Sequence, residues 1–210
     1  MSDVQQAYNS WAQQYDTNEN KTRDLEARSL RETLSSRSFE HCLEIGCGTG
    51  KNTVWLLEKA ATVTSVDLSE EMLAKAKQKL NSSNVTFIQA DITKPWDFVN
   101  KQYDLVGFSL VLEHIDLLQP VLENAAAALK VGGHLYISEL HPFKQYSGSK
   151  ARFETEAGTQ VVTCFNHHIT DFTDAAEKTN LQLVSIKEYF DDNDSNTIPR
   201  LLTLLFIKKA

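Results

Sequence analysis

Cysteine is scarce in this chain of 210 residues, and its arrangement argues against both disulfides and zinc. Cys42, Cys47 and Cys164 are odd in number and form no CxxC pair, so neither a disulfide framework nor a Cys-rich zinc site is expected. The HxH and HExxH spacings are absent as well, and no metal is predicted. The three thiols are expected to pack as small apolar side chains.

Long apolar runs and blocks of positive charge are also missing. No run approaches the ~20 apolar residues that span a bilayer, and the first residues lack the basic-then-apolar pattern of a signal peptide. The formal net charge is −7, which disfavours a partner whose affinity depends on phosphate neutralisation. We therefore expect a cytoplasmic protein with no membrane and no nucleic-acid partner.

The composition is that of an ordinary globular protein, with 41% hydrophobic and 23% charged residues, and the length suggests one domain. Strand and helix patterns alternate along it. Strands are expected at 41–45, 62–66, 85–89, 103–111 and 134–140, with helices at 51–60, 69–80 and 120–130. This alternation predicts a parallel sheet covered by helices on both faces. A further helix at 171–179 precedes two strand-like runs, 181–190 and 200–208, which are expected to pair as an antiparallel hairpin.

Three glycines follow the first expected strand. Gly46, Gly48 and Gly50 can adopt positive φ and let a ligand approach bare backbone at the start of a helix. Asp67 ends the second strand about 20 residues later, where a carboxylate suits the two hydroxyls of a ribose. The region predicts a nucleoside-type cofactor site. The third glycine is displaced by one from the G-x-G-x-x-G dinucleotide fingerprint, which disfavours an NAD(P)-dependent oxidoreductase.

The E-x-G-x-G-x-G pattern at 44–50 resembles motif I of the Rossmann-like (class I) S-adenosylmethionine (SAM) methyltransferases of the small-molecule type. The resemblance continues through DLSEEMLAKAK, QADI, YDLVGFSLVLEHI and ALKVGGHLYISE, and so covers nearly the whole chain. It implies SAM as the cofactor. It also implies a doubly wound α/β fold with a seven-stranded, mostly parallel sheet, an antiparallel C-terminal hairpin and helices on both faces.

The resemblance also implies roles for individual cofactor residues. The glycines pass the methionine part of SAM, Asp67 binds the ribose, Met72 borders the adenine, Asp91 meets its amino group and Ile92 packs on the ring. Met72 and Tyr15 are alternatively core residues, the two aspartates are alternatively caps, and Glu44 has a supporting role. The predicted cofactor set is Tyr15, Glu44, Gly46, Cys47, Gly48, Asp67, Leu68, Met72, Asp91, Ile92 and Ser109.

Histidines are the candidate catalytic residues, because transfer to a hydroxyl or amine releases a proton and imidazole titrates near neutral pH. His141 directly follows the fifth strand and is the first candidate base, with His167 and His168 next. His114 follows the fourth strand and is expected either to contact the acceptor or to pack against a helix.

Four donors gather in one short segment, at Lys144, Tyr146, Lys150 and Arg152. They form either a solvated loop or a clamp for a carboxylate or phosphate on the acceptor, for which arginine is the better fork. Tyr146 and Arg152, with His114, are the predicted acceptor-binding residues.

The sequence thus predicts one domain, 1–210, with an N-terminal helical lid at 1–40 and a substrate-side insert at 141–168. Its predicted reaction is direct transfer of a methyl group from SAM to an oxygen or nitrogen of a small-molecule acceptor, by a monomer or homodimer. A non-catalytic SAM-binding module and an NAD(P)-dependent oxidoreductase are the alternatives. The acidic charge disfavours an RNA methyltransferase.

Overall fold

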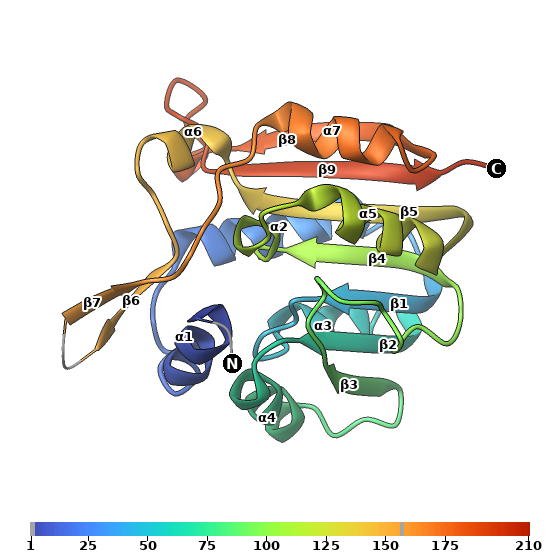
Figure 1. Ribbon diagram of the computed structural model, residues 1–210, viewed down its shortest axis with the longest axis horizontal. Coiled ribbons are helices and arrows are strands. Elements are labelled where there is room, and N and C mark those ends of the chain that lie inside the picture. Colours follow the sequence, from blue (N-terminus) through green and yellow to red (C-terminus); the bar gives the residue numbers. More distant parts are fainter. Residues whose placement is uncertain (1–2, 156–157) are drawn as a thin grey trace.

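The computed structural model describes residues 3–155 and 158–210 (Figure 1). Residues 1–2 of the predicted lid and 156–157 of the predicted insert lie outside this description. The helices are α1 (Asp3–Trp11), α2 (Lys21–Leu34), α3 (Lys51–Leu56), α4 (Glu70–Lys79), α5 (Leu118–Ala128), α6 (Pro142–Tyr146) and α7 (Ile169–Glu177), with short 3-10 helices η1 (Leu112–His114) and η2 (Asp191–Asn193). The strands are β1 (Phe39–Ile45), β2 (Ala60–Asp67), β3 (Val85–Gln89), β4 (Tyr103–Ser109), β5 (Leu129–Leu140), β6 (Arg152–Thr155), β7 (Gly158–Val161), β8 (Leu181–Tyr189) and β9 (Leu201–Lys208).

Seven strands form the main sheet in the order β3-β2-β1-β4-β5-β9-β8. β9 runs antiparallel to both of its neighbours, and the other six strands point the same way. The predicted doubly wound sheet and its antiparallel C-terminal hairpin are confirmed. The chain moves outward from β1 on one side and from β4 on the other, so the strand order reverses between them. A crevice for a ligand is expected at that point, outside the carboxyl ends of the strands.

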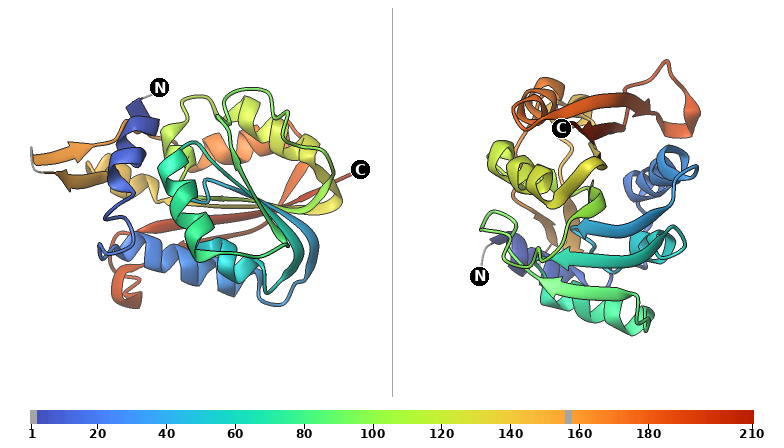
Figure 2. Two further views of the ribbon diagram at one scale, coloured as in Figure 1. Left: turned by 90° about the horizontal axis from the view of Figure 1, so that it is seen from below. Right: turned by 90° about the vertical axis from the view of Figure 1, so that its right-hand side faces the viewer.

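Helices cover both faces of the sheet, as predicted (Figure 2). α5 and α7 pack on one face over a core that contains Val106 and Phe108 of β4. α2 and α3 pack on the other, where Leu34 and Trp55 meet Leu105. Successive side chains of β4 thus enter opposite cores, because strand residues alternate between faces. Burial on both sides explains why the central strands are nearly continuous apolar runs.

The regions outside the alternating pattern carry structure that the prediction lacked. The predicted insert contains α6 and a two-stranded hairpin of β6 and β7, a small sheet of its own. This hairpin and α1 lie beyond the carboxyl ends of the central strands (Figure 1). The ring of Trp11 stacks on that of Phe153 with centroids 5.1 Å apart, in a cluster that also contains Met72 and Val162. The N-terminal helix and the insert therefore pack together over one edge of the sheet.

We expect Gly46→Ala to destabilise the protein more than Gly132→Ala. Both glycines have positive φ, +73° and +81°, so both variants carry the strain of a left-handed alanine, about 1 kcal/mol. A Cβ at Gly46 would lie 2.8 Å from Val111 Cβ, whereas a Cβ at Gly132 meets nothing within 4 Å among the described residues. Overpacking should cost Gly46→Ala a further ~1–3 kcal/mol in the free energy of unfolding, measured with urea. Equal losses would contradict this account.

Candidate active site

A cavity opens at the carboxyl ends of β1, β2 and β4, where the strand order reverses. Its floor is the glycine loop after β1, and its walls come from the ends of β2 and β4, the segment after β3, η1 and the N-terminal helix. The lining residues are Val4, Tyr8, Tyr15, Ile45, Gly46, Gly48, Val66, Asp67, Leu68, Ala90, Asp91, Ile92, Thr93, Ser109, Leu110, Val111, His114 and Ile115.

Most of the predicted cofactor residues line this cavity: Tyr15, Gly46, Gly48, Asp67, Leu68, Asp91, Ile92 and Ser109. Gly46 lets the loop pack directly on Val111, because a side chain at this position would collide with it. Aromatic and aliphatic side chains, carboxylates and glycine backbone without side chains are what an adenosine with a charged amino-acid tail requires. The cavity therefore fits SAM.

Glu44, Cys47 and Met72 belong to the predicted cofactor set, and the structure places them behind the cavity wall. Glu44 points to the opposite face of β1 from Ile45, where its Oε2 accepts hydrogen bonds from Thr53 Oγ1 at 2.5 Å and Ser65 Oγ at 2.8 Å. Burial raises the pKa of Glu44 to about 7. These bonds tie β1 to β2 and α3 beneath the glycine loop.

The other two residues behind the wall are packing residues. Met72 is fully buried and packs with Trp11 and Phe153. It therefore supports the N-terminal helix, which agrees with the alternative prediction that Met72 is a core residue. Cys47 is buried under the glycine loop, with its Sγ 3.7 Å from the carbonyl oxygen of Gly48. Burial raises the pKa of the Cys47 thiol, which therefore packs as an apolar group.

Asp67 joins the two loops that form the cavity floor. One carboxylate oxygen accepts a hydrogen bond from the backbone N–H of Gly48 at 2.7 Å, and the other accepts from that of Ser69 at 2.8 Å. Ser69 caps α4 by accepting from Met72 N, so capping does not need Asp67. Desolvation by burial raises the pKa of Asp67 despite these bonds. Asp67 thus holds the glycine loop in place at the rim that a ribose would reach.

A second cavity lies beside the first and shares Tyr8, Tyr15 and Leu110 with it. Its remaining wall is polar, and comes from the start of α2, the insert and the end of β5. The lining is completed by Trp11, Asn20, Lys21, Thr22, Arg23, Glu113, Leu140, Ser149, Lys150, Ala151, Arg152 and Arg200. Two adjoining cavities of this kind provide room for a cofactor and for an acceptor next to it.

The junction between the cavities is built from the segment after β4. Leu110 has a φ of +56°, which is strained for a branched-chain residue and turns the backbone between the two spaces. Glu139 Oε1 accepts hydrogen bonds from the N–H groups of Val111 at 3.0 Å and Leu112 at 2.9 Å. A buried carboxyl at the end of β5 thus fixes the start of η1, which carries Glu113 and His114.

One ring nitrogen of His114, Nε2, can accept a hydrogen bond at the junction between the two cavities. Its Nδ1 lies 2.7 Å from the carbonyl oxygen of Thr163, and a carbonyl only accepts, so Nδ1 carries a hydrogen. In the neutral ring, Nε2 is then an acceptor, and it takes the hydroxyl hydrogen of Tyr8 at 2.8 Å. The ring is therefore held in the tautomer that can accept a proton from a hydroxyl at the edge of the cofactor cavity.

His141, the first predicted base, does not line either cavity. It is fully buried, its Nδ1 accepts from the N–H of Phe143 at 3.2 Å and its Nε2 donates to Glu188 at 3.0 Å. Burial lowers the pKa of His141 against the opposing effect of Glu188. His141 does follow β5, as predicted, but its ring points toward Glu188 of β8 and caps α6. With both nitrogens bonded, it is a structural residue.

His167 and His168 also lie outside both cavities. His167 Nε2 donates to the carbonyl of Ile115 at 2.8 Å, and its ring packs edge-on against Phe172. His168 precedes α7 and pairs through Nδ1 with the hydroxyl of Tyr146. The adjacent histidines do face different surroundings, as strand-like alternation predicts. Tyr146 and His168 bond to each other, and neither lines the two cavities.

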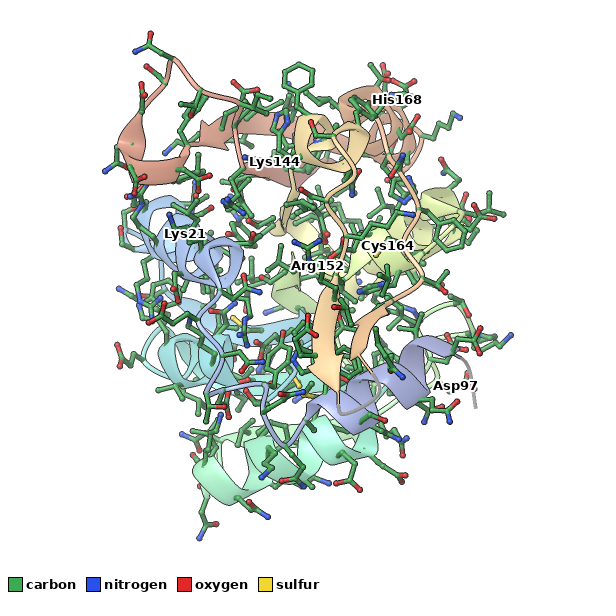
Figure 3. All side chains as sticks on the ribbon, turned by 90° about the vertical axis from the view of Figure 1, so that its left-hand side faces the viewer. Lys21, Asp97, Lys144, Arg152, Cys164 and His168 are labelled. Atoms are coloured by element: carbon green, nitrogen blue, oxygen red, sulfur yellow. The ribbon has the colours of Figure 1, made fainter. Side chains whose placement is uncertain are left out.

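The predicted donor cluster is divided by the structure. Lys144 Nζ lies 3.6 Å from Asp191 Oδ2, just after the end of β8. Tyr146 pairs with His168, away from both cavities. Lys150 and Arg152 line the second cavity. In Figure 3, Arg152 lies near the middle of the face that the insert covers, whereas Lys144 and His168 lie toward the C-terminal strands. Arg152 therefore stays a predicted acceptor-binding residue, whereas Tyr146 lines neither cavity.

Glu113, His114 and Cys164 are the one cluster among the described residues whose donor atoms could hold a metal ion, all within 4.8 Å. The His114 nitrogen near Cys164 is Nδ1, at 3.8 Å, and it already donates to Thr163. Burial raises the pKa of the Cys164 thiol to about 12, which disfavours the thiolate that a metal needs. These residues do not suit a metal, and the absence of one stays a prediction.

Glu139 should make stability fall as pH rises. Desolvation and the nearby Glu113 raise the pKa of Glu139 to about 8, so between about pH 5 and 8 the folded protein retains a proton that the unfolded chain releases. The free energy of unfolding then decreases by up to ~1.4 kcal/mol per pH unit in this window. Glu139→Gln removes this contribution and should make urea-unfolding stability fall less steeply between pH 5 and 8, most clearly between pH 7 and 8, above the pKa of Glu44. Glu123→Gln, a change at an exposed carboxyl, should leave the wild-type pH dependence unchanged. Parallel profiles for wild type and both variants would refute the raised pKa of Glu139.

The family comparisons agree with this geometry. Residues 43–137 match the family described as methyltransferase domain. The malonyl-[acyl-carrier protein] O-methyltransferase of Bacillus cereus is 33% identical over 141 residues, which cover 64% of this chain and 51% of that protein. The ubiquinone biosynthesis O-methyltransferase of Coxiella burnetii is 30% identical over 158 residues, covering 70% and 65%. The chain spans about half the length of the first curated relatives it matches, 46% and 47% of two malonyl-[acyl-carrier protein] O-methyltransferases.

Solved structures share the whole fold. The N-methyltransferase NodS of Bradyrhizobium japonicum, in complex with S-adenosyl-L-homocysteine, aligns over 100% of both chains with a TM-score of 0.75 and 20% identity. A SAM-dependent methyltransferase from Mesorhizobium loti aligns over 86% of this chain and 96% of its own, with a TM-score of 0.69 and 21% identity. The fold and cavity define a Rossmann-like α/β protein of the SAM-binding type. Residues 43–137 thus carry a methyltransferase domain, and the chain has the fold of solved SAM-dependent methyltransferases, so the predicted class and cofactor are confirmed.

Several lining residues were not predicted. Leu110, Val111, Glu113 and Ile115 lie in the segment SLVLEHI after β4, and their position at the end of a central strand was a usable signal. Tyr8 of α1 also lines both cavities. None of the described helices is both long and apolar enough to cross a membrane.

Proposed function

We propose that the protein transfers a methyl group from SAM to a hydroxyl or amine of a small-molecule acceptor. The observation that carries this proposal is the pair of adjoining cavities that meet at Tyr8, Tyr15 and Leu110. The first offers the glycine loop, Asp67 and Asp91 to the cofactor. The second offers polar side chains to an acceptor, and the imidazole of His114 lies at their junction.

SAM, when bound, supplies a sulfonium-activated methyl group for direct displacement. The protein orients both partners and excludes water, which is the main contribution required of it. Tyr8 and Tyr15, both partly buried, close the cofactor cavity from the N-terminal side, and desolvation raises the pKa of Tyr15 to about 12, so it stays neutral.

The acceptor hydroxyl or amine takes the place of the Tyr8 hydroxyl at His114 Nε2. As the acceptor atom bonds to the methyl carbon and the carbon–sulfur bond breaks, its proton passes to Nε2. S-adenosylhomocysteine leaves as the product. Thr163 keeps the Nδ1 hydrogen in place and so orients the ring throughout. Glu113, adjacent on η1, lines the second cavity beside this junction.

The proposal is tested by calorimetry with S-adenosylhomocysteine, followed by transfer of labelled methyl from SAM to a library of small hydroxy and amino compounds. Binding with transfer to at least one compound supports it. Tight cofactor binding without transfer to any compound would favour the non-catalytic SAM-binding alternative. No binding of S-adenosylhomocysteine would refute the assignment of the first cavity.

A further inference from the structure

The wall of the second cavity carries an excess of positive charge. Its basic residues are Lys21, Arg23, Lys150, Arg152 and Arg200, and Glu113 is the one acidic residue among its described lining. The chain as a whole has a net charge of −7. A basic cavity in an acidic protein is therefore a local feature that its overall composition does not explain.

Two of the five cations already have structural partners. Arg200 forms an ion pair with Asp191, with Nη2 at 2.7 Å from Oδ2. The Arg23 guanidinium lies 4.2 Å from the ring centroid of Tyr15 and donates to the Tyr15 carbonyl. Both residues hold the walls of the cavity together, and their charges still contribute to its potential.

The other three cations are available for a ligand. Lys21, Lys150 and Arg152 have no carboxylate within 4 Å in the parts of the chain that the structure describes. They come from the start of α2 and from the segment leading into β6, which are distant in sequence and line one cavity. Lys21 and Arg152 are seen on the same face in Figure 3.

The position of Arg152 is set by buried neighbours rather than by an ion pair. Its neighbour Phe153 is 3% exposed and stacks on Trp11, and its backbone pairs with that of Val161 in the hairpin. The backbone of Arg152 is thus fixed beside the cavity, and its exposed guanidinium has no carboxylate within 4 Å in the described chain. Uncompensated cations that converge on one cavity suit an anion, and arginine binds carboxylate or phosphate through two parallel hydrogen bonds.

We propose that the acceptor carries an anionic group, a carboxylate or a phosphate, which binds Lys21, Lys150 and Arg152 while its hydroxyl or amine faces Glu113 and His114. This inference rests on the proposed methyltransferase function. The buried carboxyl of Glu113 would repel an anion at the reacting end, because like charges at a buried site are unfavourable. The anion is therefore the handle by which the acceptor is held, and the methylated atom is its hydroxyl or amine.

The test titrates inorganic phosphate and malonate, separately, into the full-length protein with and without S-adenosylhomocysteine at constant ionic strength. Lys150→Gln/Arg152→Gln removes two cavity charges. Arg31→Gln/Lys77→Gln removes two exposed charges from α2 and α4, outside the cavity, and so matches the change in net charge. We expect at least one anion to bind wild type, with affinity reduced about tenfold or more in the cavity variant and unchanged in the control.

The two anions distinguish the two sources of charge. Tighter binding of phosphate indicates a phosphorylated acceptor, and tighter binding of malonate indicates a carboxylate. Failure of both anions to bind wild type, or equal losses in the two double variants, would overturn the inference. S-adenosylhomocysteine binding is read in the same titrations and should be unchanged in both variants. Its loss from wild type would instead count against the proposed function.

Discussion

Asp67→Asn should weaken the binding of S-adenosylhomocysteine by about 10–100-fold, or ~1.4–2.8 kcal/mol, which is the scale of losing hydrogen bonds to a charged acceptor. Both carboxylate oxygens of Asp67 accept from backbone N–H groups, those of Gly48 and Ser69. An amide presents an N–H donor at one of these positions, so one bond becomes a repulsive contact. The glycine loop loses its anchor, and a ribose loses the negative charge at the rim of the cavity.

Asp104 supplies a matched control at the opposite end of the sheet. One of its carboxylate oxygens accepts from the N–H groups of Glu40, at 3.0 Å, and His41, at 2.8 Å. Asp104→Asn therefore disturbs a comparable carboxylate–backbone contact near the amino ends of the strands, far from both cavities. Calorimetry should show wild-type affinity for S-adenosylhomocysteine in this variant. If Asp67→Asn also stayed within threefold of wild type, the cofactor role of Asp67 would be wrong.

The sheet could be predicted because its signals are local. Apolar runs, β-branched residues and the glycine turn after β1 identify β1 to β5, and the polar link before Arg200 identifies the last hairpin. Asp67 and the glycine loop could be predicted for the same reason, since strand ends and sharp turns are set by nearby residues. Glu44, Cys47 and Met72 of the predicted cofactor set lie behind the cavity wall, because the direction in which each side chain points depends on tertiary packing.

The acceptor side could not be predicted because it depends on contacts between distant segments. Lys21 and Arg152 are separated by about 130 residues and line one cavity only after α1 packs on the insert. His141 follows β5 as expected, but Glu188 on β8 draws its ring away from the site. His114 was expected either to contact the acceptor or to pack against a helix, and the Thr163 carbonyl that fixes its tautomer lies 49 residues away in the sequence. The orientation of these side chains is set by residues that are distant in the sequence, so no local pattern predicts it.

His114→Ala should lower kcat for methyl transfer by about 10²–10⁴-fold, the usual contribution of a positioned general base. The acceptor is one found with wild type in the labelled-methyl assay. His114 Nε2 accepts a hydroxyl hydrogen at the junction of the cavities, and no other described histidine lines either cavity. Affinity for S-adenosylhomocysteine should change only a few-fold, because the glycine loop and Asp67 remain.

His114→Asn separates a base from a residue that only supports the fold. An asparagine amide can still donate to the Thr163 carbonyl from nearly the place of Nδ1, but it has no atom at the place of Nε2. If His114 is the base, Asn should be as slow as Ala; if it is only structural, Asn should restore activity. His134→Asn, on β5 at the far end of the sheet, is the control and should keep the wild-type rate and pH profile. A His114→Asn rate within about threefold of wild type from pH 6 to 9 would exclude proton transfer to His114 and favour an acceptor that is already deprotonated.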